Sequence, residues 1–581
     1  MRTTRTMSCR GGNRYPLALV VLFLTCGLLV LGSSCSHPLI PKEPRTPREV
    51  EVPAYLKDIL GEVAQVAGRE VIPVQGYGFV TGLDGTGTKA MPPGLRREVL
   101  DMMRKHKVPH PEDILNSPDN AVVMVMGQLT PGIATGERFD LDVRAAPSTD
   151  TSSLEGGFLL ECELTRVATT AGGAEQKSEI LAMGQGPIFV PPASSDDRST
   201  STGDPHVGRI MAGGKDTKTR HFRLVLVTPS VRTADQLVRL INTRFPGAAQ
   251  GTEDPGHVNL AVPKEYQDDK LHFLDLIGAI YLRETPDARD SRIKLLADTL
   301  ASGKDMDRTS LCLEAFGGAV LPHLRPLAEH PSAAVRFYVG RTLAALQDAE
   351  AVIILEPIAL DDKSEFQEMA VEALGHLKNG VGMGVLGRTL NAKSARVRVA
   401  AWQCMARLAP RMFVAQNYLD KFKLSIVSSK ADPFLYISRT MEPEIALFGN
   451  ITIRPPILAE TRRVTATAVA GDKTITVISR SHERDFRIDA PLDVRRFIEA
   501  VAAPMDLEKT GKPQGLDLDY SDVVGLLNKM SQRQALSGPI VLQPLKYRVP
   551  GDRPTARPIG ESDNTDIKVE DLAPPEPKSK K

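Results

Sequence analysis

The chain has 581 residues, 25% of them charged and 42% hydrophobic, which is enough for roughly three or four domains of ordinary size. Its 72 Lys and Arg residues nearly balance its 71 Asp and Glu residues, so the formal net charge at pH 7 is +1. A chain without a strong net charge has no overall field that would attract nucleic acid, and we therefore expect no nucleic-acid partner.

The N-terminus has the pattern of an export signal. Its basic residues are Arg2, Arg5, Arg10 and Arg14. An uncharged, mostly apolar run follows over residues 17–31, and the small residues Gly32, Ser33 and Ser34 come next. The apolar run is too short to span a bilayer comfortably, and this order of regions is typical of a signal peptide. We therefore expect residues 1–34 to direct export.

Cys35 stands directly after this segment. The sequence Leu31-Gly-Ser-Ser-Cys35 resembles a bacterial lipobox, in which cleavage before the cysteine is accompanied by lipid attachment to its thiol. Gly32 occupies the position where such sequences usually have a large aliphatic residue. Residues 35–53 are rich in proline and charge, as expected of an extended tether from a lipidated Cys35. Ordinary cleavage nearby and an uncleaved anchor are the alternatives.

The cysteines that remain after export do not form a pattern. They are Cys35, Cys162, Cys312 and Cys404, without a C-x-x-C pair or a Cys/His cluster of zinc spacing. A disulfide framework is not indicated. Cys312 and Cys404 lie in apolar helical stretches, where we expect buried free thiols.

Residues 54–286 read as an α+β region. The continuous apolar run over 120–126 predicts a buried strand, and the alternation over 139–143 predicts a half-exposed one. Residues 221–227 predict another strand. A helix should follow over 234–245, with an apolar face formed by Ala234, Leu237, Val238 and Ile241.

Three glycine patterns between residues 76 and 90 resemble nucleotide-binding sequences, and Gly85-x-Gly87-x-x-Ala90 fits the dinucleotide pattern, but an observation speaks against each. Thr81 replaces the third glycine of one pattern, and Thr88 displaces the lysine of a P-loop by one position. In the third, Pro92 and Pro93 follow where the phosphate-binding helix should already run. Glycines in tight turns of a strand-rich body explain the segment better, and we expect no cofactor.

No catalytic or metal site is predicted either. His106 and His110 flank Pro109, which discourages the helix that a metal-binding pair would need, so they are interpreted as solvated loop residues. The chain has no G-x-S-x-G or H-E-x-x-H motif and no distinctive pair of carboxylates.

Residues 287–412 read as all helical and repeat at an interval of 31 residues. The repeated apolar positions are Leu324, Leu355 and Leu386; Val335, Phe366 and Val397; Val339, Ala370 and Ala401; Leu343, Leu374 and Met405; and Leu346, Leu377 and Leu408. Polar links over 329–332, 361–364 and 392–394 divide each unit into two helices. The pattern resembles HEAT-like repeats that stack into a solenoid, with an ordinary helical bundle as the alternative.

We expect this segment to fold as a separable module over residues 287–410. Arg336, Arg396 and Arg398 should lie near exposed helix starts, as solvated surface residues. Strands return in the following region, 413–545, where alternation predicts them over 445–453 and 473–478. The tail, 546–581, has repeated Pro, Asp, Glu and Lys and no aromatic residue, so it is predicted to be disordered.

The glycine-rich segment, read as a whole, resembles the opening signature of the bacterial flagellar basal-body P-ring protein family. The matching residues are Gly76, Tyr77, Gly78, Gly82, Leu83, Gly85, Thr86 and Gly87, and Thr88 stands where the family usually has an acidic residue. Similar pieces follow in the family's order at 120–126, 135–143, 153–160, 182–186, 208–210 and 234–245. Residues 449–455 and 516–536, the second an amphipathic helix, resemble its C-terminal part.

The resemblance implies a strand-rich P-ring-like body in two parts, interrupted by the helical repeats. It also implies a homo-oligomeric ring in the periplasm, near peptidoglycan, acting as a bushing around the rod and contacting rod and L-ring proteins, without enzymatic activity. The family usually has neither a lipid anchor nor a helical repeat block. A lipid on Cys35 would place this ring beside the outer membrane. An envelope lipoprotein scaffold that binds partners through its repeats is the alternative.

Overall fold

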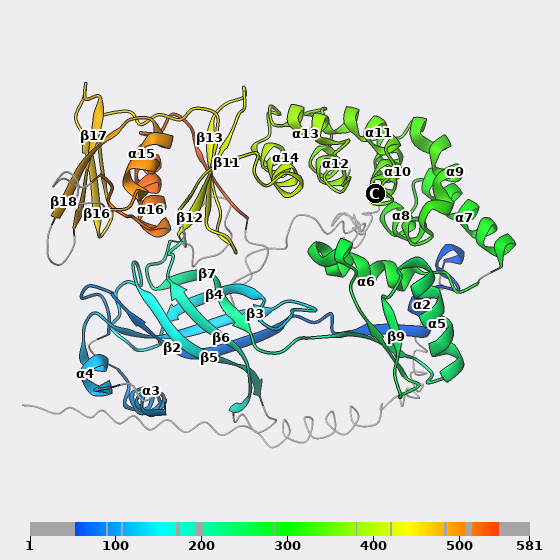
Figure 1. The fold of residues 1–581 in the computed structure, drawn as a ribbon, viewed down its shortest axis with the longest axis horizontal. Coiled ribbons are helices and arrows are strands. Elements are labelled where there is room, and N and C mark those ends of the chain that lie inside the picture. The colour runs from blue at the N-terminus through cyan, green and yellow to red at the C-terminus, as the bar shows by residue number, and fades with distance from the viewer. Residues whose placement is uncertain are drawn as a thin grey trace, which may run out of the picture. The chain divides into compact units, whose positions relative to one another are not determined.

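The computed structural model in Figure 1 describes residues 53–88, 91–105, 109–169, 175–192, 203–283, 285–378, 380–418, 421–480, 485–505 and 514–544. The predicted signal peptide, Cys35, nearly all of the tether and the C-terminal tail lie outside these residues. The described residues contain two regions of mixed strands and helices, separated by a long stretch of helices alone. The predicted α+β class is therefore confirmed. Within the described residues, no helix is long and apolar enough to cross a membrane.

A four-stranded sheet in the order β1-β8-β10-β9 packs against helices at one end of the first region. Its elements are η1 (Ala54–Leu56), α2 (Leu60–Val63), β1 (Ala64–Ala67), β8 (Phe222–Leu226), α5 (Val231–Arg244), β9 (Ala249–Gly251), β10 (His257–Leu260), η2 (Lys264–Asp269) and α6 (Lys270–Ala279). The strand and helix predicted here are confirmed as β8 and α5, since α5 buries Ala234, Leu237 and Ile241. Ser230 caps α5 by accepting a hydrogen bond from the Thr233 amide.

The segment of the chain between β1 and β8 contains six strands that close into a barrel, in the order β2-β3-β4-β7-β6-β5. They are β2 (Ile72–Thr81), β3 (Ala121–Leu129), β4 (Arg138–Ala145), β5 (Phe158–Thr169), β6 (Glu175–Pro187) and β7 (Val207–Asp216). The strands predicted over 120–126 and 139–143 are confirmed as β3 and β4, and β4 alternates between buried and more exposed residues as predicted.

Two helices cover the outer face of β2 and β3. These are α3 (Pro93–Lys105) and α4 (Pro111–Asn116), and they bury Phe79 and Val122 beneath Val99, Met103 and Leu115. Because β3 is thereby buried on both sides, its sequence reads as a continuous apolar run and does not alternate.

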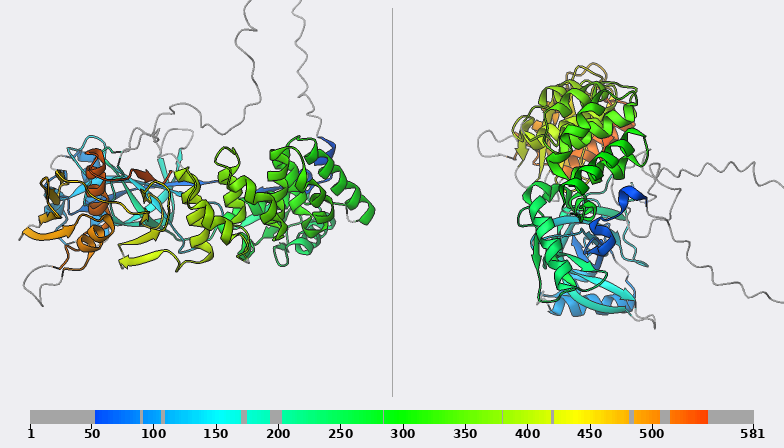
Figure 2. Two further views of the ribbon diagram at one scale, coloured as in Figure 1. Left: turned by 90° about the horizontal axis from the view of Figure 1, so that it is seen from above. Right: turned by 90° about the vertical axis from the view of Figure 1, so that its right-hand side faces the viewer.

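Helices alone occupy the described residues between 286 and 408. They are α7 (Pro286–Ala301), α8 (Met306–Ala315), η3 (Gly317–Val320), α9 (Leu321–Leu324), η4 (Arg325–Glu329), α10 (Ala333–Ala345), α11 (Glu350–Ala359), α12 (Gln367–Leu374), α13 (Met383–Thr389) and α14 (Ala395–Leu408). Neighbouring helices pack side by side, and the left view of Figure 2 shows them as one row. Ser332 and Ser394, from the polar links, cap α10 and α14.

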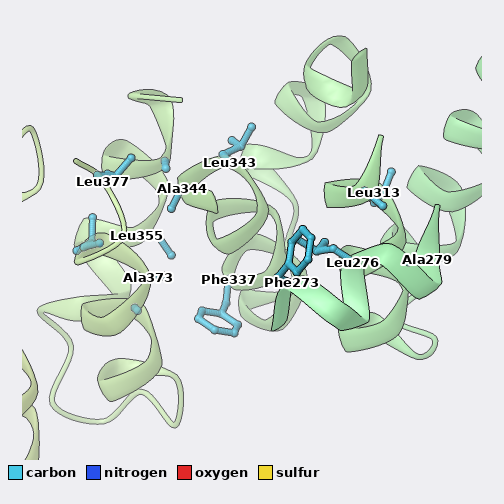
Figure 3. Packing of buried hydrophobic residues seen from close by; sticks show 14 of the residues in the cluster. Phe273, Leu276, Ala279, Leu313, Phe337, Leu343, Ala344, Leu355, Ala373 and Leu377 are labelled. Carbon is cyan, nitrogen blue, oxygen red and sulfur yellow. The ribbon is translucent and has the colours of Figure 1, made fainter. Parts of the chain in front are cut away.

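The positions of the 31-residue repeat face the interior of this helical block. All fifteen are buried or partly buried, and Leu324, Leu355 and Leu386 are fully buried. Figure 3 shows Leu343, Leu355 and Leu377 within the common cluster. The repeat therefore marks the packing face, as expected, while the HEAT-like classification stays a prediction.

The core of the helical block is continuous with both of its neighbours. Phe273 of α6 lies in the same cluster as Phe337 of α10 (Figure 3), and the cluster extends to Phe434 and Phe448 after the block. Arg292 of α7 also donates to the Tyr55 carbonyl oxygen. Cutting the chain near 287 and 410 would expose buried apolar surface at both ends, so this packing argues against the predicted clean separability.

The C-terminal region contains two sheets and two helices. Its elements are β11 (Val414–Tyr418), β12 (Phe422–Val427), β13 (Phe434–Ile437), β14 (Glu444–Phe448), β15 (Ile457–Glu460), β16 (Val464–Ala468), β17 (Thr474–Arg480), β18 (Asp485–Pro491), α15 (Val494–Ala502), α16 (Tyr520–Gln532) and β19 (Ile540–Leu542). One sheet runs β11-β12-β14-β13-β19 and the other β15-β16-β17-β18.

Two predictions for this region are corrected in their extent. The strand predicted over 445–453 ends at Phe448, because Gly449 has φ +77° and turns the chain out of the strand. The closing helix predicted over 516–536 is the shorter α16, which begins after the capping residue Asp519. The strand over 473–478 is confirmed as β17.

The prediction that Arg398 is a solvated surface residue is wrong. Its side chain is 3% exposed, with Nη1 donating to the Asp432 carbonyl oxygen at 2.7 Å and the guanidinium 4.5 Å from the centre of the Phe434 ring. Desolvation lowers the pKa of this guanidinium, and the nearby Asp432 opposes the shift. Arg396, two residues earlier, is exposed as predicted. Arg398 thus joins α14 to the following sheet.

We predict that Arg398→Ala lowers the free energy of unfolding by about 2–3 kcal/mol, because a charge-assisted hydrogen bond and a cation–π contact are lost together. The matched exposed variant Arg396→Ala should change it by less than about 0.5 kcal/mol. Urea titration followed by circular dichroism measures both values. Equal effects of the two substitutions would contradict the anchoring role of Arg398.

Candidate functional site

The signature residues begin inside the barrel, on β2. A Cβ atom at Gly78 would lie 2.6 Å from Leu159 Cδ1 and 2.9 Å from Val125 Cγ2, and one at Gly76 would collide with the Glu163 carbonyl oxygen. These two positions therefore let β2 approach β5 closely. Tyr77, between them, points to the outer face and packs against the cluster beneath α3 and α4.

The second half of the signature is the turn that leaves β2. Gly82 and Gly85 have φ values of +78° and +84°, a conformation that side-chain-bearing residues rarely adopt. Leu83 lies between them and is fully buried in the barrel core. At Gly87 a Cβ atom would collide with the Asn120 carbonyl oxygen. The structure thus brings all eight signature residues into one barrel strand and its adjoining turn.

Backbone amides of this turn are already used by neighbouring carbonyl groups. Leu83 N donates to Asp119 O at 2.8 Å, Gly87 N to Pro118 O at 2.7 Å, and Thr88 N to Asn120 O at 2.7 Å. A phosphate-binding loop instead leaves successive amides pointing at the ligand. The geometry therefore agrees with a structural turn and with the expectation that this segment does not hold a nucleotide.

Arg462, in the turn between β15 and β16, binds this signature turn. Its Nη1 donates to Thr86 Oγ1 at 2.6 Å, and its Nη2 donates to the Asp84 carbonyl oxygen. Thr86 Oγ1 also lies 2.9 Å from the carbonyl oxygens of Leu83 and Ser153. Arg462 thus connects the C-terminal region to the signature turn, and Thr86 connects that turn to a second loop of the barrel, which contains Ser153.

The neighbouring Arg463 lies over the second of these loops. Its Nη1 is 4.0 Å from Asp522 Oδ2 at the start of α16, and its Cδ is 3.4 Å from the position of a Cβ atom at Gly156. Burial raises the pKa of the Asp522 carboxyl to about 7, with repulsion from Asp519 as the next cause. Because the Arg463–Asp522 contact is 4.0 Å long, the direct hydrogen bonds of Arg462 are the firmer connection.

Sequence reasoning did not identify Arg462 or Arg463. They follow β15 in a polar turn that looks like many other solvent-exposed turns, and the barrel residues that they contact lie more than 300 positions earlier. Spacing within one sequence contains no signal for such a long-range contact.

The remaining candidate groups are not brought together. His110 is exposed, 4.0 Å from the Asp113 carboxylate, while His106 lies outside the described residues. The described part of the chain contains no group of three or more His, Cys, Asp or Glu residues that could hold a metal ion. Cys312 and Cys404 are buried free thiols as predicted, and burial raises the pKa of Cys312 to about 11.

The barrel and the first sheet lie within the region that matches a known family. Residues 59–293 match the family model described as flagellar P-ring protein. This region is similar to flagellar P-ring proteins. The matched region contains the whole signature, the closed barrel, the four-stranded sheet and the first half of α7. Most of the helical block and the C-terminal region lie beyond it.

Curated relatives agree with this assignment. The flagellar P-ring protein of Anaeromyxobacter sp. (strain K) is 27% identical over 300 residues, which cover 50% of this chain and 77% of that protein. The Caulobacter vibrioides protein is 30% identical over 213 residues, covering 35% and 55%. The Thermotoga maritima protein is 30% identical over 225 residues, covering 37% and 63%. The chain thus spans less than two thirds of the last two relatives.

We predict two separate costs for replacing signature glycines by alanine. Gly78→Ala should lower the free energy of unfolding by about 1–3 kcal/mol through overpacking against Leu159. Gly85→Ala meets no neighbouring atom within 4 Å, but its positive φ should cost about 1–2 kcal/mol. The control Gly387→Ala, in α13 and equally uncrowded, should be neutral or stabilising by up to about 1 kcal/mol. Urea titration measures the free energy of unfolding of the three variants. A Gly78→Ala variant as stable as the wild type would refute the role of Gly78 in letting β2 approach β5.

Proposed function

We propose that this protein is a structural component of the flagellar basal body that forms the periplasmic P ring, a bushing around the distal rod. The observation that carries the proposal is the family match over residues 59–293. The glycine signature of this region forms strand β2 of the closed barrel and the turn that follows it. The same match disfavours the alternative, an envelope scaffold lipoprotein. No enzymatic reaction is proposed, because the family is structural.

The mechanism in this proposal is geometric. A bushing must keep its shape while a shaft turns inside it, and this requires subunits that do not deform. The barrel supports such a role, because each of its six strands pairs with a neighbour on both sides. The signature turn is also fixed by the hydrogen bonds of Leu83, Gly87 and Thr88. A head-to-tail interface whose rotation closes would then generate a ring of identical subunits.

We further propose that the strand-rich body has two parts, with the helical block inserted between them. The region after the block would be the second P-ring-like part, since residues 449–455 and 516–536 resemble the family's C-terminal motifs. Arg462 supports this arrangement, because it connects that region directly to the signature turn at Thr86 and Asp84. The predicted contacts with rod and L-ring proteins and the proximity to peptidoglycan belong to this proposal.

The helical block would add a surface for another envelope component. Helix α11 exposes Ile353 and Pro357 on one side, together with its C-cap residue Leu360, and Ile353 is 74% exposed. Residues at intervals of four and three lie along one face of a helix. A lipid on Cys35 would hold the ring at the outer membrane through the tether of residues 35–53.

Deletion of the gene should remove the P ring. We expect electron cryotomography of basal bodies in the deletion strain to lack the periplasmic ring density around the distal rod. Expression of the wild-type chain should restore the density and motility, whereas the Gly78→Ala variant should restore less of both. An intact P ring in the deletion strain would refute the proposed function.

Lipidation of Cys35 can be tested separately from ring formation. We expect metabolic labelling with an alkyne fatty acid to mark the wild-type chain and to leave Cys35→Ser unlabelled. The control Cys162→Ser, which changes a buried barrel thiol, should retain the label. Equal labelling of the wild type and Cys35→Ser would place the anchor elsewhere and leave the ring proposal standing.

A further inference from the structure

The outer surface of the barrel is covered unevenly. Helices α3 and α4 cover β2 and β3. The C-terminal region contacts β4 and β7, where Met441 N donates to Asp140 Oδ1 at 2.8 Å and Arg209 Nη1 donates to the Arg439 carbonyl oxygen. The outer side of β5 and β6 has no such cover among the described residues. We call the exposed residues Phe158, Leu160, Glu161, Ile180 and Pro187 the barrel face.

The barrel face is apolar and acidic. Phe158, Leu160 and Ile180 are between 37% and 46% exposed, and Phe158 is directly opposite Pro187 in the strand register. Glu161 is exposed beside them, where a bulge in β5 follows Leu159. Phe158, Leu160 and Pro187 lie close together, whereas Ile180 lies further along the strands, opposite Thr165. Exposed apolar side chains on a sheet surface, next to charge, are typical of a protein interaction site.

A second exposed surface lies on the four-stranded sheet. One side of β8 is buried with α5 and α6, and the other presents Arg223 and Val225. Val227, just after the strand, is 64% exposed. Val231, which is 65% exposed, and Arg232, also exposed, follow at the start of α5, next to the end of β8 in the sequence. We call these five residues the sheet face, which is apolar and basic.

We propose that the barrel face of one subunit binds the sheet face of the next copy of this chain. The inference rests on the proposed ring function and assigns its subunit interface. Both faces offer exposed apolar side chains, and their charges are opposite, with Glu161 on one and Arg223 and Arg232 on the other. Opposite charges beside apolar contacts favour the correct pairing and disfavour each face pairing with itself.

The faces are two different surfaces of one chain, so the contact is heterologous. Each subunit then uses its barrel face toward one neighbour and its sheet face toward the other, which is the arrangement that a closed ring requires. An isologous dimer would instead bring two copies of one surface together. This difference gives the proposal a direct test.

The first experiment uses cysteine pairs in the full chain, expressed in the deletion strain and treated with a short bismaleimide. Leu160→Cys and Val225→Cys alone should each give monomers. Their coexpression should give dimers, and both changes in one chain should give a ladder of covalent multimers. The described native cysteines are buried and should not react. Dimers from either single variant, or only monomers from the double variant, would overturn the assigned interface.

The second experiment exchanges the charges. Glu161→Lys and Arg223→Glu should each reduce the assembled fraction in detergent-extracted envelopes by about tenfold, and the combination should recover most of it, because the opposite signs are restored. The exposed controls Glu368→Lys and Arg396→Glu, in the helical block, should assemble like the wild type. Absence of rescue, or equal losses in the controls, would reject the pairing of these faces.

The assembly of the wild-type chain distinguishes a failure of this interface assignment from a failure of the proposed function. If it assembles while the face variants behave like the controls, the ring function stands and the interface assignment fails. If the wild-type chain is monomeric in the envelope and the deletion strain keeps its P ring, both fail. Thermal unfolding of each variant verifies that the substituted chain is folded.

Discussion

The close approach of strands inside the barrel is the constraint on which the rest of the structure depends. Glycines line the interior where large side chains need room. A Cβ atom at Gly127 would lie 2.6 Å from the Phe139 ring, and one at Gly184 would lie 2.8 Å from Leu141 Cδ1. Phe139 and Leu141 fill the space that these glycines leave. The packing is therefore complementary, with small residues on one strand facing large residues on another.

This constraint explains why the strands were predictable while the barrel was not. Alternation and continuous apolar runs identified β3, β4, β8 and β17, since these patterns follow from which faces are buried. Closure depends on which strand pairs with which, and β2 pairs with β5 across more than 70 intervening residues. One sequence contains no record of that pairing. The signature glycines were recognised as turn and packing residues, but their partners at Leu159 and Asn120 came only from the structure.

The errors of prediction share a physical cause. Arg398 was expected at the surface because arginine is usually exposed, yet the Asp432 carbonyl oxygen and the Phe434 ring replace its hydration. The 31-residue repeat correctly gave the buried positions of the helical block. It gave no indication that the block shares its core with the sheet before it and the sheet after it. Periodicity reports the packing inside a segment, whereas contacts between distant segments leave no local pattern.

Closure also decides how subunits can associate. An open sheet offers unpaired edge strands, and association through edges can continue without limit into fibres or aggregates. The barrel leaves no such edge, and in the four-stranded sheet the edge strand β9 has only three residues. Association through the barrel and this sheet then relies on side chains of the sheet surfaces, where shape and charge select the partner and the rotation between subunits. A closed ring of fixed size needs that selectivity, because an interface tolerant of many rotations would not return to its starting point.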